Sequence, residues 1–147
     1  MPNFSTGLRN GMLYNIGFTT AMSGGVLKIF SGPVPTNADA AETGTLLATI
    51  TGDGDAMTGL SFATPEGAIL SKDPDQVWRT NSISESGQAT YFRLVANEDD
   101  GLENPASMRV QGSIANAGAD MNVTSTTFTA GQPWTLNYFN LAFPTGY

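Results

Sequence analysis

The chain of 147 residues contains neither cysteine nor histidine. The lack of cysteine excludes disulfide bonds and thiolate metal sites. The lack of histidine removes the side chain that most often acts as a general base near neutral pH, and the commonest ligand of zinc or copper. Most familiar catalytic centres would therefore lack a member, and we expect a protein that is not an enzyme and holds no cofactor.

Charge is also scarce. Charged residues make up 13% of the chain, and 13 Asp and Glu against 6 Lys and Arg give a formal net charge of −7. A protein that holds a phosphate backbone needs a basic face, so we expect no nucleic-acid partner. The acidity favours solubility; a partner with a basic surface, or a bound cation, is the alternative.

Long apolar runs are missing as well. No stretch approaches the roughly 18–20 continuous apolar residues that a membrane span needs, so we expect no membrane partner. Arg9 is the only basic residue before Lys28, and polar residues such as Asn10 and Asn15 interrupt the apolar stretch that follows. This makes a poor signal peptide, and we expect a soluble protein that the usual export route does not take.

The clearest strand pattern lies at residues 89–96, where β-branched and aromatic residues alternate with a period of two. The alternation places Phe92 and Leu94 on one face, which we expect to pack against a core. Tyr91, Arg93 and Val95 fall on the opposite face, which Arg93 interrupts. Turn residues mark both ends of the segment.

Other short segments read as strands between turns rich in Gly, Pro and Asn. They are 26–30, 45–51, 59–64, 108–114, 121–124, 126–129 and 134–143, the last with an irregularity near Tyr138 and Phe139, and a further short strand could begin at 68–70. About eight short strands at this spacing predict a mainly β protein. We expect one domain over residues 1–147, an antiparallel β-sandwich or jelly-roll-like fold at 26–143 with a short N-terminal helix.

The N-terminal helix is expected at about residues 6–22. An apolar stripe with helical spacing supports it, formed by Leu8, Met12, Leu13 and Ile16. Ser5 or Thr6 could serve as the N-cap. Gly11 and Gly17 oppose the helix by roughly 1 kcal/mol each relative to Ala, and the alternation at 14–19 leaves a strand as the alternative.

Several residues are candidates for chemistry. Carboxylates in Gly-rich turns could form a catalytic acid–base pair or bind calcium. Solvated turns also account for acidic residues at these positions, and the spacing of a known calcium-binding loop is absent. The carboxylates are Asp53, Asp55, Glu98, Asp99, Asp100 and Glu103. Aromatic residues could stack on sugars, although core packing explains most of them; they are Trp78, Trp134, Tyr138 and Tyr147. Arg93 and Arg109 are expected to share a sheet face and to pair with the acidic loops.

The order of segments resembles a group of small virion structural proteins of tailed bacteriophages. The segments that carry the resemblance are 26–32 (VLKIFSG) with Pro35, 43–50 (TGTLLATI), 89–94 (ATYFRL), 109–114 (RVQGSI), 118–123 (GADMNV) and 129–132 (TAGQ), before a last strand rich in Thr and Phe. The resemblance covers most of residues 8–144. The chain departs from that pattern at Gly11, at Gly17 and in the loop 53–75.

The resemblance implies a non-enzymatic component of the virion, made in the host cytoplasm. We expect a capsid decoration (cement) protein, a trimer that binds the major capsid protein or other virion proteins on the head surface. The alternatives are a subunit of the tail tube, baseplate or head–tail joint, or a carbohydrate- or receptor-binding adhesion module. The expected contacts are apolar residues near the two termini: Leu8, Met12, Leu13, Ile16, Phe139, Phe143 and Tyr147.

Overall fold

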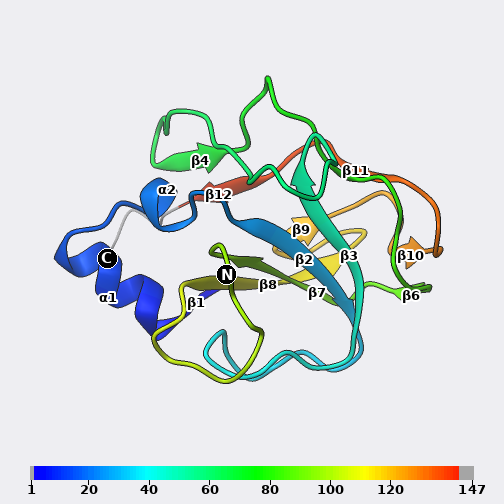
Figure 1. Ribbon diagram of the computed structural model, residues 1–147, viewed down its shortest axis with the longest axis horizontal. Helices are drawn as coiled ribbons and strands as arrows, with labels where there is room; N and C mark the ends of the chain where they lie inside the picture. Colours follow the sequence, from blue (N-terminus) through cyan, green and yellow to red (C-terminus); the bar gives the residue numbers. More distant parts are fainter. Residues whose placement is uncertain (1, 143–147) are drawn as a thin grey trace.

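The strand expected at 89–96 forms β7 (Tyr91–Val95), which lies inside the largest sheet of the computed structural model, where residues 2–142 are described. β7 pairs antiparallel with β2 (Val26–Ser31) on one side and with β8 (Arg109–Ala115) on the other. β3 (Thr45–Gly52) pairs antiparallel with β2. These four strands form the central sheet in Figure 1.

Shorter elements extend and cover this sheet. They are β1 (Asn3–Phe4), α1 (Thr6–Tyr14), α2 (Phe18–Ala21), β4 (Ile69–Ser71), β5 (Trp78–Thr80), β6 (Gly87–Gln88), β9 (Met121–Asn122), β10 (Thr127–Phe128), β11 (Trp134–Leu136) and β12 (Asn140–Ala142). The strand order is β1-β8-β7-β2-β3-β5-β11, and β9 runs parallel to β8. β6 pairs with β10 and β4 with β12, as two small antiparallel sheets.

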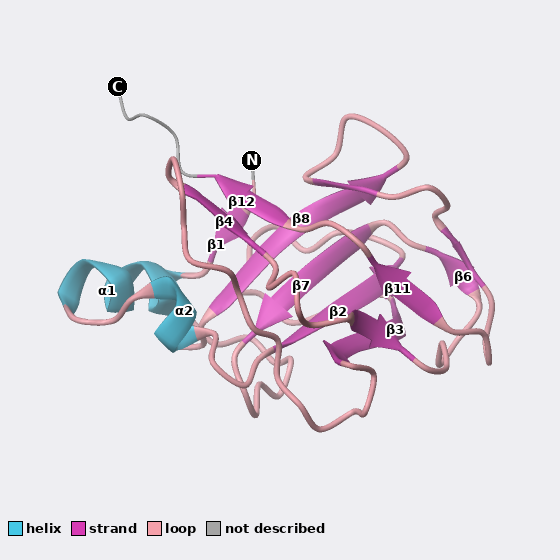
Figure 2. Cartoon of the chain, turned by 90° about the horizontal axis from the view of Figure 1, so that it is seen from above, coloured by secondary structure: helices cyan, strands magenta, loops and turns pink. Residues whose placement is uncertain are grey.

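The predicted fold class is confirmed. The chain is mainly β, with a large antiparallel sheet, a short N-terminal helix and a sandwich-like arrangement. Figures 1 and 2 both place the two helices at one end of the long axis and β6 at the opposite end. Residues 2–142 form twelve short strands, where about eight were expected.

One face of the central sheet carries the apolar core. The register pairs Leu27 with Leu94 and Ile29 with Phe92, so the alternate residues of adjacent strands stand on the same face. This face, called the apolar face below, comprises Leu27, Ile29, Phe92, Leu94 and Val110, all buried. Phe92 and Leu94 therefore lie against the core as predicted.

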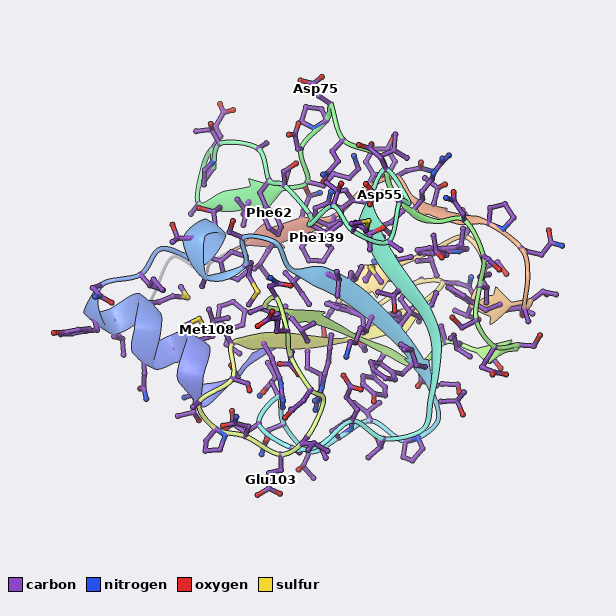
Figure 3. The ribbon with its side chains drawn as sticks, in the orientation of Figure 1. Asp55, Phe62, Asp75, Glu103, Met108 and Phe139 are labelled. Atoms are coloured by element: carbon purple, nitrogen blue, oxygen red, sulfur yellow. The ribbon has the colours of Figure 1, made fainter. Side chains whose placement is uncertain are left out.

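Aromatic side chains fill the space between the apolar face and the segments that cover it. Trp78 is fully buried, and its ring lies 5.4 Å from the ring of Phe62 and 5.4 Å from that of Phe139. Figure 3 shows Phe62 and Phe139 in the interior, whereas Asp75 and Glu103 project at opposite ends of the molecule. Aromatic rings in such tilted and edge-on contacts bury large apolar areas. The expectation that Trp78 is a core residue is confirmed.

The expected helix at 6–22 is two helices. α1 begins as predicted, because the Ser5 hydroxyl accepts a hydrogen bond from the Leu8 N–H. It ends at Tyr14, after which the Ile16 N–H bonds back to the Gly11 carbonyl and Gly17 adopts an extended conformation. A continuous helix was therefore wrong, and Gly17 lies at the break between α1 and α2.

Two expected strands also differ. Residues 59–64 do not form a strand; Phe62 makes only an isolated bridge to Lys72, because the segment crosses over the core instead of joining a sheet. The stretch 134–143 was expected as one strand with an irregularity near Tyr138. It is two strands, β11 and β12, which join different sheets, so the change of direction at 137–139 is larger than a bulge.

Candidate functional site

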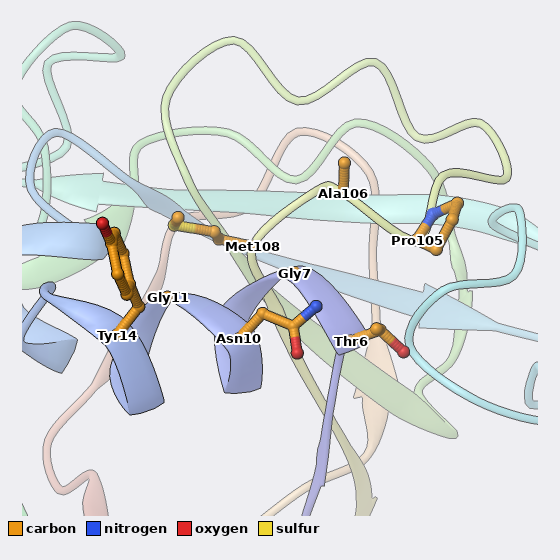
Figure 4. Close-up of a pocket in the computed structure, with 8 residues that line it drawn as sticks. All are labelled: Thr6, Gly7, Asn10, Gly11, Tyr14, Pro105, Ala106 and Met108. Atoms are coloured by element: carbon orange, nitrogen blue, oxygen red, sulfur yellow. The ribbon is translucent and has the colours of Figure 1, made fainter.

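The main surface feature of the helical end is an open groove beside α1. About 600 Å³ in volume, it lies between α1 and the segment 105–108 and has no charged residue in its lining. Its lining residues are Thr6, Gly7, Asn10, Gly11, Tyr14, Pro105, Ala106 and Met108. Figure 4 shows the Thr6, Asn10 and Tyr14 side chains along α1 opposite Pro105, Ala106 and Met108. This surface is called the helix groove.

A close approach of backbones shapes the floor of the helix groove. A Cβ atom added to Gly7 would lie 2.3 Å from the Ala106 carbonyl oxygen, and one added to Gly11 would lie 3.2 Å from the Met108 methyl group. Glycine is thus required at Gly7, where α1 rests on the backbone of Ala106, whereas a Cβ at Gly11 would be tight but would need only a small shift of the Met108 and Ile16 side chains. The cost of glycine in a helix is offset by this packing, which the sequence alone did not reveal.

Large apolar side chains stand exposed next to the helix groove. Leu13 and Tyr14, at the end of α1, are 87% and 86% exposed. Scattered exposed apolar residues are normal on a protein surface; here two adjacent ones stand at the end of α1, and Tyr14 also lines the uncharged groove. All 13 Asp and Glu residues lie between positions 39 and 120, so α1 and α2 carry no negative charge.

The residues expected to form a partner interface fall into three groups. Leu8 and Phe139 are buried in the core, so their assignment to an exposed contact surface is wrong. Met12 and Ile16 are partly buried and pack against that core, whereas Leu13 is exposed. Phe143 and Tyr147 lie outside the described residues. Leu8 was misassigned because helical spacing identifies an apolar stripe without identifying what covers it.

The opposite face of the central sheet is polar and equally buried. Its buried polar residues are Tyr91, Arg93, Arg109 and Gln111, beside the buried Phe30 and Val95, and it is called the arginine face. Residues 33–44, called the covering loop, pack over it: the Tyr91 hydroxyl donates to the Thr43 carbonyl oxygen at 2.7 Å, and the Gln111 amide donates to that of Pro35 at 2.9 Å. The two arginines share a face, as predicted.

Arg109 is the centre of this arrangement. Its Nε lies 2.7 Å from an oxygen of Asp99, whose side chain is 2% exposed. Its two terminal nitrogens donate to the carbonyl oxygens of Ala38, Ala40 and Leu102. The planar guanidinium therefore ties two loops to β8. The expected ion pair with an acidic loop is confirmed for Arg109.

Arg93 is buried without such a partner. Its Nε donates to Gln111 and one terminal nitrogen donates to the Asn37 carbonyl oxygen, but within residues 2–142 no acceptor reaches its Nη1. Burial lowers the pKa of Arg93 below its ordinary value, and the neighbouring charge of Arg109 lowers it further. The expected pairing of Arg93 with an acidic loop is not seen, since its direct partners are an amide and a carbonyl.

The candidate carboxylates serve mainly as turn acceptors. Asp53 accepts the Val77 N–H, and Asp55 accepts the N–H groups of Met57 and Thr58. The Thr58 hydroxyl also donates to the Asp55 carboxylate, and this bond, followed by those from the Thr58 and Met57 N–H groups, lowers the pKa of Asp55. Within residues 2–142, no group of three or more acidic side chains is placed to hold a metal ion.

The remaining acidic candidates lie around the loop 98–104. Asp99 is bound by Arg109, while Glu98, Asp100 and Glu103 are exposed. Glu103 and Asp55 lie far apart in Figure 3, so the two groups of carboxylates do not form one site.

The aromatic residues expected to bind sugars differ in their exposure. Trp78 is buried and inaccessible, Trp134 is partly buried and Tyr138 is 82% exposed. Trp134 and Tyr138 line the same shallow hollow beside β9. Tyr147 lies outside the described residues.

No helix within residues 2–142 has the length and apolar character to cross a membrane. Comparison with models of protein families, with curated proteins and with solved structures returns no match.

Proposed function

We propose that this chain is a non-enzymatic structural protein of a tailed-phage virion, a capsid decoration protein that binds and stabilises the head shell. The resemblance of its segments to such proteins supplies the class. Contact with the major capsid protein would stabilise the shell by mass action, because a subunit that binds only the assembled shell favours that state.

The observation that carries the proposal is the exposed apolar patch at the helical end. Leu13 and Tyr14 lie beside the uncharged helix groove, and neither α1 nor α2 carries an acidic residue. On a chain of charge −7, two helices without an acidic residue bring little negative charge to a partner. Burial of Leu13 in a shell contact would contribute about 1.5–3 kcal/mol.

The protein is proposed to assemble as a trimer on the outer surface of the head, after synthesis in the host cytoplasm. A trimer would bind the shell more tightly than a monomer, because its three helical ends contact the same shell at once. Its mass in solution is measured by light scattering during gel filtration.

The first test locates the protein on particles of the phage that encodes it. Gold-labelled antibody against the purified chain is imaged on intact virions by electron microscopy. Label distributed over the head is the expected result. Label confined to the tail would contradict decoration and indicate a tail subunit, and unlabelled particles would contradict a place in the virion.

The second test asks whether the helical end makes the contact. Particles that lack the protein are incubated with purified Leu13→Glu, and bound protein is counted after sedimentation. We expect at least a tenfold loss of occupancy, because a charge replaces a contact methyl group. Met57→Glu is the matched control, since Met57 is 90% exposed in the loop after β3, outside α1 and the groove lining, and the charge change is the same. Equal occupancy by the two variants would contradict the assignment of the helical end.

A further inference from the structure

A second surface feature lies around β9 and Tyr138 and shares no lining residue with the helix groove. Two shallow hollows of about 240 and 150 Å³ adjoin each other, and both are lined by Asn122 and Tyr138. Each is smaller than the roughly 300–1,000 Å³ typical of a site for a drug-sized ligand. We call the pair of hollows the Tyr138 cleft; its size suits single small rings placed on either side of the Tyr138 side chain.

The cleft offers aromatic surfaces held in different ways. Tyr138 is 82% exposed, whereas Trp134 is partly buried and packs on Phe128 with ring centroids 5.0 Å apart. Phe128 is itself buried, so the Trp134 ring is fixed before any ligand arrives. A fixed ring costs little conformational entropy on binding. The cleft thus combines an exposed aromatic surface with a rigid one.

Neutral amides surround these rings. Asn122 and Asn137 line the cleft, and Asn140 borders it. The Asn122 Oδ1 accepts the Ala119 N–H at 3.0 Å, and the Asn140 Oδ1 accepts the Ser71 hydroxyl at 2.7 Å, which fixes both side chains. Asparagine offers both a donor and an acceptor without charge, and this matches hydroxyl groups, which also do both.

Charge narrows the class of ligand further. Residues 121–142 contain no charged side chain, and the one acid in the lining, Asp120, accepts hydrogen bonds from the N–H and hydroxyl of Ser113. Among the described residues that line the cleft there is no Lys or Arg, and the net charge of −7 would repel an anionic ligand. A cation would find no group of carboxylates. The lining therefore favours a neutral polyhydroxyl ligand.

We propose that the Tyr138 cleft binds a neutral saccharide. One pyranose ring stacks its C–H face on Tyr138, and the amides of Asn122 and Asn137 exchange hydrogen bonds with its hydroxyl groups. A proline-rich peptide would also use exposed aromatics, but the paired amides and the small separate hollows favour sugar rings. The proposal is independent of a place in the virion, because it concerns a different surface and a different partner.

The test is an NMR titration of the isotope-labelled full chain with methyl pyranosides of glucose, galactose, mannose and N-acetylglucosamine, together with a printed glycan array. We expect at least one neutral sugar to shift the amide signals of residues 120–124 and 134–140. Tyr138→Ala should weaken that binding at least tenfold, and Tyr138→Phe, which keeps the ring, by less than threefold. Tyr14→Ala is the matched control, an equally exposed tyrosine at the helical end, and should bind like the original chain.

Four outcomes would overturn the proposal. They are the absence of shifts with every neutral sugar, shifts confined to other residues, equal binding by Tyr138→Ala, and binding of a proline-rich peptide or an anionic glycan in place of the neutral sugars. Thermal unfolding of Tyr138→Ala, expected to match that of the original chain because Tyr138 is exposed, separates loss of the site from loss of the fold. Tyr138→Phe supplies a second, more conservative variant.

Discussion

The two faces of β7 are buried to the same degree by opposite means. Phe92 and Leu94, on the apolar face, are 2% and 0% exposed, and Tyr91 and Arg93, on the arginine face, are both 0% exposed. The apolar face is held by contact between hydrocarbon surfaces. The arginine face is held by hydrogen bonds to the backbone of the covering loop. A loop can thus close a sheet face, but only if its carbonyl oxygens receive donors.

The largest effect is expected from Arg109→Met. The substitution leaves Asp99 buried without its cation and leaves the carbonyl oxygens of Ala38, Ala40 and Leu102 without their donor. Breaking a buried pair in this way costs about 3–5 kcal/mol. Urea unfolding followed by tryptophan fluorescence measures the loss. A change below about 1 kcal/mol would show that the arginine face contributes little to stability.

Truncating one side chain on the apolar face should lower the free energy of unfolding slightly less than Arg109→Met does. Leu94→Ala removes a fully buried side chain and leaves a cavity, so we expect a loss of about 3 kcal/mol. Leu13→Ala is the control, because the same truncation at an exposed position should change stability by less than about 0.5 kcal/mol. If Leu94→Ala cost no more than Leu13→Ala, the apolar face would not be the main core.

Arg93→Met separates the two arginines of one face. Arg93 has no carboxylate partner in direct contact and an unpartnered Nη1 among the described residues, and burial already disfavours its charge. We therefore expect the free energy of unfolding to change by no more than about 1 kcal/mol in either direction, since replacing a poorly paired buried ion with an apolar side chain often leaves stability unchanged. The same urea experiment as for Arg109→Met checks this. If Arg93→Met and Arg109→Met lowered the free energy of unfolding equally, the loss would arise from the burial of each arginine and not from the ion pair of Arg109 with Asp99.

The contrast between the faces also explains how far the sequence predicts the fold. Alternation along 89–96 correctly separated Phe92 and Leu94 from Arg93, because side chains alternate across a strand. It did not predict that the second face is buried. That outcome depends on the covering loop, whose contacts with Arg109 join residues 71 positions apart, and no local pattern encodes such a distance.

The candidate surfaces were predicted less well than the strands, for the same reason. Leu8 and Leu13 lie in one apolar stripe, yet Leu8 is buried and Leu13 is 87% exposed. The helix groove needs Ala106 and Met108 beside α1, and nothing near residues 6–14 in the sequence points to them. Trp134 and Tyr138 were named as possible sugar-binding residues; their position in one hollow became visible only with β9 beside them.

A loss smaller than those of Arg109→Met and Leu94→Ala is expected where the covering loop meets α1. Asp39 accepts hydrogen bonds from the Thr6 N–H at 2.7 Å and from the Thr6 hydroxyl at 2.6 Å. Burial raises the pKa of Asp39, but these bonds and the charges of Arg9 and Arg109 outweigh burial and hold the pKa below its ordinary value of 3.8. The stabilisation is therefore complete above the pKa of the unfolded chain and is lost as the pH falls through the lower pKa of the folded protein.

Asp39→Asn removes that dependence, because the amide cannot ionise and presents one acceptor where the carboxylate presents two. We expect a loss of about 1 kcal/mol at pH 7, typical of an acceptor at a helix N-terminus, and a smaller difference from the original chain at pH 3. Urea unfolding at pH 7, 5, 4 and 3 measures both. Asp75→Asn has the same charge change at an exposed turn and controls for net charge. If the two variants lost equal stability at pH 7, the contact between Asp39 and Thr6 would add nothing to stability beyond its charge.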